Sequence, residues 1–492
     1  MGWLSLSIWT PIVIGALLLL FGKDSQATLV RWLALIGSVI SFLVTLPLYS
    51  GFKLGTAEMQ FVENVPWIER FNVNYHLGVD GLSVWFVLLT AFITIIVVIA
   101  GWEVIQRKVN QYMASFLILS GIMIGVFCAL DGILFYFFFE ATLIPMYLII
   151  GVWGGPNKIY AAFKFFLYTL MGSFFMLVGF IYMYAKSGGS FDLATWQQLP
   201  LSGTAQTLLF FALFAAFAVK VPMWPVHTWL PDAHVEAPTG GSIVLAAIML
   251  KLGAYGFVRF SLPILPDASR QWAWFMIALS LIAVIYVGLV ALVQKDMKKL
   301  VAYSSVAHMG FVTMGFFLFN DLGISGGLVQ MIAHGFVSGA MFLCIGVLYD
   351  RLHTREISAY GGVINVMPRF GAFALLFFMA NCGLPGTAGF VGEWMVILAS
   401  VRTNFWLGLL LATALISGAG YSLWMFKRVY FGAVGNDNVR TKMPDINWRE
   451  CTALALLAIA VLWMGVYPKP FTDVMDASVA NLVKQVAISK LN

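Results

Sequence analysis

Charge is scarce in this chain. Only 10% of its 492 residues are Asp, Glu, Lys or Arg, whereas 61% are hydrophobic. Soluble globular domains carry about 25% charged residues, so the composition excludes that class. The net charge of +6 comes from basic residues scattered over short polar segments, which is not the pattern of a nucleic-acid-binding surface. The composition therefore indicates a polytopic helical membrane protein that contacts lipid and binds no nucleic acid.

Sequence motifs for cofactors are also missing. The chain has only four cysteines, which lie in or beside apolar runs and share no metal-ligand or disulfide-framework spacing: Cys128, Cys344, Cys382 and Cys451. We find no phosphate loop, no dinucleotide fingerprint and no convincing histidine pair for haem. The sequence therefore predicts that this chain itself holds no redox centre and no metal.

Apolar runs of about twenty residues, separated by charged or Gly/Pro-rich segments, predict fourteen membrane spans. The first run has no basic segment before it and no small-residue cleavage site, so we expect a span and not a removed signal. The fold class is an all-α polytopic membrane protein with about 14 transmembrane helices. The predicted spans cover residues 4–21, 28–49, 82–101, 113–130, 132–151, 162–185, 206–236, 239–260, 272–294, 300–319, 327–349, 370–399, 404–430 and 452–467.

The distribution of Lys and Arg orients these spans. If the N-terminus lies outside, most of the 28 basic residues fall in inner segments, whereas the largest outer segment, 50–81, contains more acidic than basic residues. The positive-inside rule therefore favours both termini on the outer side. An even number of spans requires the two termini to agree.

The chain also contains a predicted repeat. Spans four to eight and nine to thirteen form two blocks of five, and because five is odd the second copy must be inverted. The fourth span of each block is interrupted, once after Lys220 and once within 381–393. Paired interruptions in inverted repeats point to a transport site. The predicted domains are an N-terminal three-helix segment (1–112), two five-helix repeats (113–261 and 262–431) and a loop with a C-terminal helix (432–492).

The first interruption places a charge and a helix break at the same depth. Lys220 lies inside an apolar run and is followed by Pro222, Pro225 and Pro231, each of which removes a backbone donor. A broken helix is tolerated in lipid only where protein or water satisfies the freed groups, and a lysine deep in a span costs roughly 3 kcal/mol on insertion scales. This combination indicates an ion path. The alternative is a kinked structural helix whose lysine reaches the interface.

Two further ionisable residues lie at membrane depth in the first block. Glu140 is the natural partner of Lys220, because each lowers the cost of burying the other; the alternative is a neutral, hydrogen-bonded structural acid. Lys251 lies about twelve residues into its span, roughly 18 Å along a helix rising 1.5 Å per residue. A lysine this close to the bilayer centre can both take and give a proton.

The second block supplies two histidines and a glutamate. His308 and His334 lie mid-span in adjacent helices, between Lys251 and Glu393 in the sequence. One membrane histidine is more often a hydrogen-bonding core group, but two in this order favour a proton relay, since imidazole accepts on one nitrogen and donates from the other. Candidates for either helix capping or proton uptake lie near span ends: Asp131, Lys164, His227, Asp232, His234 and Glu236.

Six motifs, in this order along the chain, resemble the antiporter-like proton-channel subunits of respiratory complex I, the proton-pumping NADH:quinone oxidoreductase. The resemblance covers nearly the whole chain. The M-type members carry a glutamate where the L- and N-type members carry lysine, so Glu393 and the absence of a long lateral helix make the chain similar to the M type. The motifs are Phe137-Phe-Phe-Glu-Ala-Thr-Leu-Ile-Pro-Met-Tyr147, Phe217-Ala-Val-Lys-Val-Pro222, His227-Thr-Trp-Leu-Pro-Asp-Ala-His234, Leu250-Lys-Leu-Gly-Ala-Tyr-Gly256, Tyr303-Ser-Ser-Val-Ala-His-Met-Gly-Phe311 and Gly389-Phe-Val-Gly-Glu393.

For the first repeat, the resemblance implies that Glu140 and Lys220 form the ion pair of the input half-channel and that Lys251 is the central proton carrier. It implies a chain that works as part of a proton-translocating enzyme, in a bacterial plasma membrane or, alternatively, the mitochondrial inner membrane. The expected partners are other membrane subunits of the complex, including the L- and N-type sisters.

For the second repeat, the resemblance implies that His308 and His334 form the linking relay and that Glu393 is the terminal residue of the output half-channel. FMN and iron–sulfur clusters are expected on other subunits. Two alternatives stay open: a subunit of a multisubunit Na+/H+ antiporter or membrane-bound hydrogenase of the same superfamily, and a purely structural membrane scaffold. A scaffold has no need of buried ionisable groups, which favours proton coupling.

Overall fold

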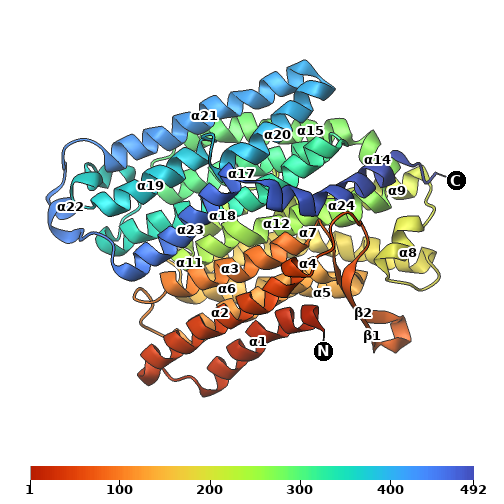
Figure 1. Ribbon diagram of the computed structural model, residues 1–492, viewed down its shortest axis with the longest axis horizontal. Helices are drawn as coiled ribbons and strands as arrows, with labels where there is room; N and C mark the ends of the chain where they lie inside the picture. The colour runs from red at the N-terminus through yellow and green to blue at the C-terminus, as the bar shows by residue number, and fades with distance from the viewer. Residues whose placement is uncertain (1, 492) are drawn as a thin grey trace.

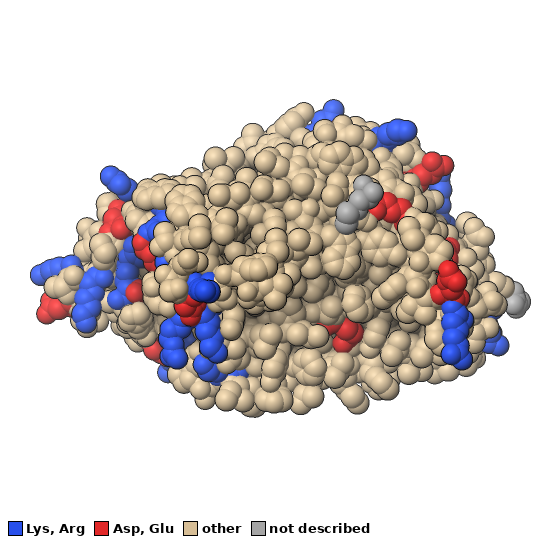
Figure 2. All heavy atoms as spheres, turned by 90° about the horizontal axis from the view of Figure 1, so that it is seen from below, with Lys and Arg blue, Asp and Glu red and all other residues tan. Residues whose placement is uncertain are grey.

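The computed structural model describes residues 2–491 and consists of long helices that lie side by side along its longest axis (Figure 1). One end of the bundle carries the short helix α22 (Asp437–Lys442). The opposite end carries a β-hairpin and the C-terminus (Figure 1). Charged side chains gather at these two ends, and the face in Figure 2 is almost free of charge between them. Such an uncharged band is typical of a protein that crosses a lipid bilayer.

Nine helices precede the first break in the bundle. They are α1 (Trp3–Phe21), α2 (Ala27–Ser50), α3 (Val84–Ala100), α4 (Val109–Cys128), α5 (Gly132–Ala141), α6 (Leu143–Trp153), α7 (Lys158–Lys186), α8 (Leu193–Gln198) and α9 (Gly203–Lys220). After the break come α10 (Trp229–Glu236), α11 (Thr239–Val244), α12 (Leu250–Gly256), α13 (Leu262–Ile264), α14 (Pro266–Gln271), α15 (Ala273–Ile282), α16 (Gly288–Leu292), α17 (Met297–Phe316) and α18 (Asp321–Leu352). The chain continues with α19 (Pro368–Asn381), α20 (Ala388–Thr403), α21 (Phe405–Tyr430), α22, α23 (Trp448–Val466) and α24 (Lys469–Ala487).

The predicted class, a helical polytopic membrane protein, is confirmed. Eleven helices in the described range are long and apolar enough to cross a membrane, or twelve if the bent pair 357–365 and 368–381 counts as one span. The predicted number of fourteen is not reached by this measure. One reason is that α3 and α20 have only 17 and 16 residues; another is that α17 carries Lys298, Lys299 and His308.

A β-hairpin and a C-terminal helix are among the elements that were not predicted. The outer segment 50–81, expected to be a loop, contains the antiparallel strands β1 (Gln60–Ile68) and β2 (Val73–Val79). The C-terminal region contains α24, whose Ser478 hydroxyl accepts a hydrogen bond from the Gly81 amide just after β2, at 3.0 Å. The hairpin and α24 therefore cover the same end of the bundle.

The centre of the bundle is formed by two helical runs. The most apolar stretches of 239–264 and of α18 are completely buried, whereas only 39% of the corresponding stretch of α1 is buried. The run 239–264 contains two π-helical turns, η3 (Leu245–Met249) and η4 (Phe257–Ser261), on either side of α12. π-turns widen the hydrogen-bonding pattern of a helix and occur frequently at functional sites.

Both predicted interruptions are present as helix breaks. Between α9 and α10 the chain leaves the helix at residues 221–228, and the indole nitrogen of Trp229 donates to the Val219 carbonyl at 2.8 Å. Between α19 and α20, Gly383 and Gly386 adopt φ values of +77° and +89°, which glycine adopts without steric cost. The two breaks replace helical hydrogen bonds by contacts within the protein, as a membrane interior requires.

Candidate functional site

Lys251 lies at the centre of the site. It belongs to α12 and is 0% exposed. Its Nζ lies 2.6 Å from Nδ1 of His334 on α18 and donates to the Ala246 carbonyl at 2.5 Å. Ala246 lies in the π-turn η3, so the irregular turn supplies a carbonyl to the lysine. Since an ammonium can only donate, a charged Lys251 requires His334 to accept on Nδ1 and to carry its own proton on Nε2.

The ring of His334 lies near that of His308 on α17. The two imidazole rings lie 5.7 Å apart and are inclined by 49°, and both side chains are buried. The Nε2 of His334 has no hydrogen-bond partner among residues 2–491. In this tautomer the proton on Nε2 of His334 is not bound by any acceptor among the described residues.

His308 joins the relay to Glu393. Nδ1 of His308 lies 2.6 Å from Oε1 of Glu393, and Nε2 lies 3.1 Å from Oδ1 of Asn381. The amide oxygen can only accept, so Nε2 donates to it, and a proton is shared along the short contact between Nδ1 and the carboxyl group. A carboxyl group and an imidazole at this distance form a charge-assisted hydrogen bond, which is stronger than a neutral one.

Neighbouring residues pack closely around the carboxyl group of Glu393. Gln330 donates to Oε1 at 3.2 Å, and a Cβ at Gly383 would approach Oε2 to 3.0 Å. Beside Glu393 lies a cavity of about 10 Å³ that also borders His308 and Tyr421. This is about the space that one water molecule needs. The carboxyl group therefore lies between His308 and room for about one water molecule.

Lys220 and Glu140 are arranged differently. Lys220 is 2% exposed; its Nζ donates to the Thr142 hydroxyl at 3.3 Å and lies 4.9 Å from the centre of the Phe139 ring. No salt bridge joins Lys220 to Glu140 within residues 2–491, and Oε1 of Glu140 is buried without a hydrogen-bond partner. Glu140 lies on α5 and Lys220 on α9, and the structure holds their charged groups apart.

The close approach of α9 and α12 places Lys220 near the helix of Lys251. A Cβ at Gly253 would lie 2.8 Å from the Phe217 carbonyl and 2.9 Å from Cβ of Lys220. Only glycine leaves room for this contact. The base of the Lys220 side chain therefore lies against the helical turn that carries Lys251, whereas its Nζ points toward Thr142.

The residues near span ends fall into two groups. Asp131 caps α5 by accepting from the amides of Ile133 and Leu134, and Asp232 forms a 2.6 Å salt bridge with Lys164. Glu236 likewise accepts from a backbone amide, that of residue 157, at 2.9 Å. By contrast, Nδ1 of His227 and both ring nitrogens of His234 are buried without partners in the described chain.

Sequence reasoning missed the uncharged members of the site. Gln330 and Asn381 touch the relay directly, and Thr142 holds Lys220. One signal was available for Gln330, because it precedes His334 by four residues and so lies on the same face of α18. Within residues 2–491 no three His, Cys, Asp or Glu side chains come together as a metal site.

The fold and the site together define a class: polytopic helical membrane proteins with a buried line of ionisable side chains. Comparison with known proteins identifies the family within this class. Residues 129–417 match the family profile described as NADH:quinone oxidoreductase/Mrp antiporter, TM, and residues 6–129 match NADH-ubiquinone oxidoreductase chain 4, amino terminus. The chain therefore belongs to the NADH:quinone oxidoreductase/Mrp antiporter family, and within it to the subunit M or chain 4 group.

Individual relatives agree with this assignment. The chain is 50% identical to the NADH-quinone oxidoreductase subunit M of Rhodobacter capsulatus, over 98% of this chain and 96% of that protein. It is 47% identical to the NADH-ubiquinone oxidoreductase chain 4 of Arabidopsis thaliana, over 96% and 95%. A chain of respiratory complex I from Thermus thermophilus with bound NADH is similar with a TM-score of 0.90 and 32% identity, over 98% and 99% of the two chains.

Proposed function

We propose that this chain is a proton-translocating membrane subunit of an NADH:quinone oxidoreductase and that Lys251, His334, His308 and Glu393 carry the proton through its second half. The observation that carries the proposal is the close succession of these four groups, with contacts of 2.6 Å at both ends and 5.7 Å between the imidazole rings. Nothing in a structural scaffold requires four ionisable side chains to be buried in a row.

The proton moves in three transfers. The Lys251 ammonium gives a proton to Nδ1 of His334, and His334 gives up the proton on Nε2. That proton passes to His308 by way of a water molecule and a rotation of the His308 ring, because Nε2 of His334 makes no hydrogen bond within residues 2–491 and both nitrogens of His308 are engaged. His308 then delivers a proton to Glu393, which releases it to water on the outer side. Each step moves one proton and no electron.

Glu140 and Lys220 control when Lys251 holds a proton. Paired with Glu140, Lys220 stays charged and raises the cost of a proton on Lys251; parted from Glu140, it relieves that cost. Two unit charges 4 Å apart interact by about 4 kcal/mol at an effective dielectric constant of 20, which is an upper figure for such a switch.

The membrane arrangement is part of the proposal. We infer fourteen spans with two inverted repeats, 113–261 and 262–431, between the N-terminal segment 1–112 and the C-terminal segment 432–492, and both termini on the outer side. The breaks after α9 and α19 support the repeat, since each follows a helix at the corresponding position of its block. Single-cysteine labelling with an impermeant reagent tests the orientation. Labelling of residue 297 from the outer side would contradict it.

The electron-transfer chemistry belongs to other subunits of the assembly, where FMN, iron–sulfur clusters and quinone are expected. The sister L- and N-type subunits are the expected membrane neighbours, in a bacterial plasma membrane or the mitochondrial inner membrane. The Mrp complex of Dietzia sp. DQ12-45-1b shares the fold with a TM-score of 0.83 but only 20% identity. The much higher identity to subunit M relatives favours the oxidoreductase over a sodium/proton antiporter.

The proposed function is tested by replacing Lys251 in the assembled complex. In vesicles reconstituted with the Lys251→Met variant, proton pumping driven by NADH oxidation should fall at least ten-fold, because methionine fills the same space without an ionisable group. The control is Lys299→Met, which removes a lysine from the first turn of α17, away from the relay, and should pump normally. A Lys251→Met complex that contains all subunits and pumps at the wild-type rate would refute the function.

A further inference from the structure

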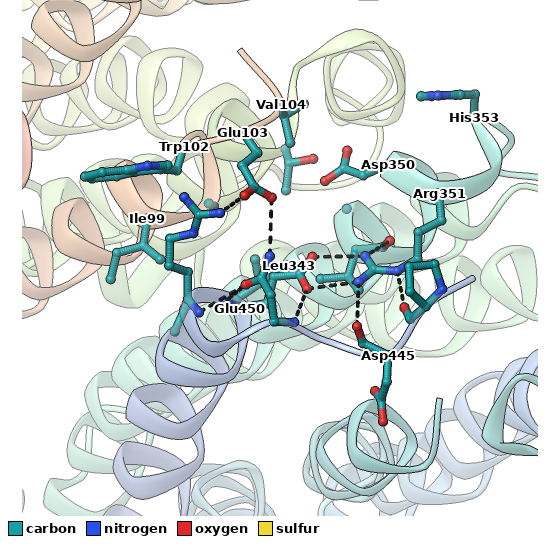
Figure 3. A pocket seen from close by; sticks show the side chains of 18 residues that line it. Ile99, Trp102, Glu103, Val104, Leu343, Asp350, Arg351, His353, Asp445 and Glu450 are labelled. Atoms are coloured by element: carbon teal, nitrogen blue, oxygen red, sulfur yellow. Dashed lines mark hydrogen bonds and ion pairs between the residues drawn. The ribbon is translucent and has the colours of Figure 1, made fainter. Parts of the chain in front are cut away.

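Two cavities at the α22 end of the bundle meet at one carboxylate. The larger one, of about 570 Å³, lies between the ends of α3, α11, α18 and α23 (Figure 3). The second, of about 330 Å³, lies beside the turn between α10 and α11. Asp350, Thr239 and Val104 line both cavities. Asp350 therefore stands at the junction between the larger cavity, the vestibule, and the second cavity.

Asp350 differs from the other charged groups of the vestibule. Both terminal nitrogens of Arg351 pair with Glu450 at 2.9 Å, and Arg449 pairs with Glu103. No dashed line reaches the Asp350 carboxylate in Figure 3, and no residue within 2–491 donates a hydrogen bond to it. The charged and titratable groups that face it come from five parts of the fold: Glu450, Arg351, Lys298, Tyr112 and Tyr360. A half-buried carboxylate without a structural contact is free to bind and release a proton.

Lys298 lies between the Asp350 carboxylate and the turn that joins α10 and α11. It lines the second cavity, is 4% exposed, and donates from Nζ to the Ala237 carbonyl at 2.7 Å. Ala237 directly follows α10, the helix that carries His234. Besides Asp350, the charged groups facing Lys298 are Arg355, Asp296 and Glu236. Lys298 thus reaches from the second cavity to the end of α10, the helix that carries His234.

His234 is the next group inward. Its ring is completely buried, stacks on Phe342 at 4.3 Å, and has no partner for either nitrogen in the described chain. The ionisable groups that interact electrostatically with it are Lys298, Lys251 and His334. Burying a polar ring without hydrogen bonds is unfavourable, and a water molecule at each nitrogen would relieve this cost. The ring is therefore placed to pass a proton between the two lysines.

We infer that the α22 end contains a proton-uptake path in which Asp350 takes up the proton, Lys298 and His234 pass it inward, and Lys251 receives it. The inference rests on the proposed function, in which Lys251 is the proton carrier. Asp350 binds a proton from water in the vestibule and gives it to the neutral amine of Lys298. Lys298 passes a proton through water to one nitrogen of His234, and His234 releases one from the other nitrogen to Lys251. Each transfer moves one proton, and no other reactant is consumed.

The test uses the whole complex in vesicles, with Asp350→Asn as the main variant and Asp350→Glu as the rescue. Asp350→Asn should pump at least three-fold more slowly than wild type at neutral pH on the vestibule side, and the difference should shrink as that side is made more acidic. Asp350→Glu should pump within about two-fold of wild type. Glu103→Gln is the matched control, since it neutralises an exposed carboxylate of the same cavity that makes only one ion pair, and it should leave pumping unchanged.

A second variant keeps the test decisive if Asp350→Asn does not assemble. His234→Gln retains hydrogen-bonding capacity but cannot take a proton in one place and release it from another, so it should slow pumping in the same way. Assembled Asp350→Asn or His234→Gln complexes that pump at the wild-type rate would overturn the uptake path. So would a loss in Asp350→Asn of equal size at every pH, because that is the mark of a structural role. If Lys251→Met also pumped normally, the proposed function would fail as a whole; if only Lys251→Met lost pumping, the uptake path alone would fail.

Discussion

The two halves of the buried charge line are built in opposite ways. From Lys251 to Glu393 the ionisable groups follow one another closely, with 2.6 Å contacts at each end. Around Lys220 the partner carboxylate of Glu140 is held apart, and the ammonium is satisfied by a hydroxyl and an aromatic ring. A connected row can conduct protons, whereas an isolated charge can only act at a distance. In the proposed mechanism the second half transfers protons and the first half, at Lys220, controls the transfer.

If this comparison is correct, breaking the connected half should have the largest effect. His308→Leu removes the imidazole that contacts Glu393 and leaves an apolar side chain of similar size. We expect NADH-driven proton pumping to fall at least ten-fold in the assembled complex. Ser304→Ala is the matched control, because Ser304 lies one turn away on α17 and its hydroxyl bonds only the Val301 carbonyl. Retention of more than half of the pumping rate by His308→Leu would show that the proton bypasses the relay.

Changing the controlling half should give a smaller and charge-dependent effect. Glu140→Gln removes the charge with which Lys220 alternates, so pumping should fall by roughly three- to ten-fold. Glu140→Asp keeps the charge, and because the control acts at a distance it should retain more than half of the activity. Equal losses in both variants would mean that Glu140 must make a contact of fixed geometry, and the distinction between the halves would disappear.

The smallest effect is expected from the support of the relay. Asn381 accepts from Nε2 of His308 and donates to the Ser422 hydroxyl at 2.8 Å. Ser422→Ala leaves the amide in place but removes its anchor, so pumping should decrease by less than about two-fold. Asn381→Leu should cost several-fold, since it leaves the imidazole nitrogen without an acceptor, a loss of about 1–3 kcal/mol for a buried donor. The ratio of the two pumping rates measures how tightly the imidazole must be held.

The charged members of the site could be predicted because the sequence offers few of them at membrane depth. Lys251, His334, His308 and Glu393 stand out from apolar surroundings, and in the structure they lie next to one another. Their order in the sequence did not determine the distances, which depend on how α12, α17, α18 and α20 pack. The gap between Glu140 and Lys220 was not predictable at all, because it depends on the rotamer of a long side chain beside Thr142.

The uncharged and end-located features escaped prediction for different physical reasons. Amide side chains such as Gln330 and Asn381 occur in many helices, so their sequence positions carry little information. Helix α24 was missed because its charged residues, among them Lys469, Asp473 and Lys484, lower the hydropathy below that of a span. The hairpin was missed because the segment follows no regular alternation of polar and apolar residues; its buried side chains cluster at the end of β2.

In the proposed path the proton leaves through Glu393 at the end of the connected half. The most direct measurement is the number of protons pumped per NADH oxidised by the reconstituted Glu393→Gln complex, compared with wild type. Glutamine keeps the size and the hydrogen bond to His308 but cannot release a proton, so the ratio should fall while the complex still contains all its subunits. An unchanged ratio at an unchanged rate of NADH oxidation would remove Glu393 from the path and contradict the account.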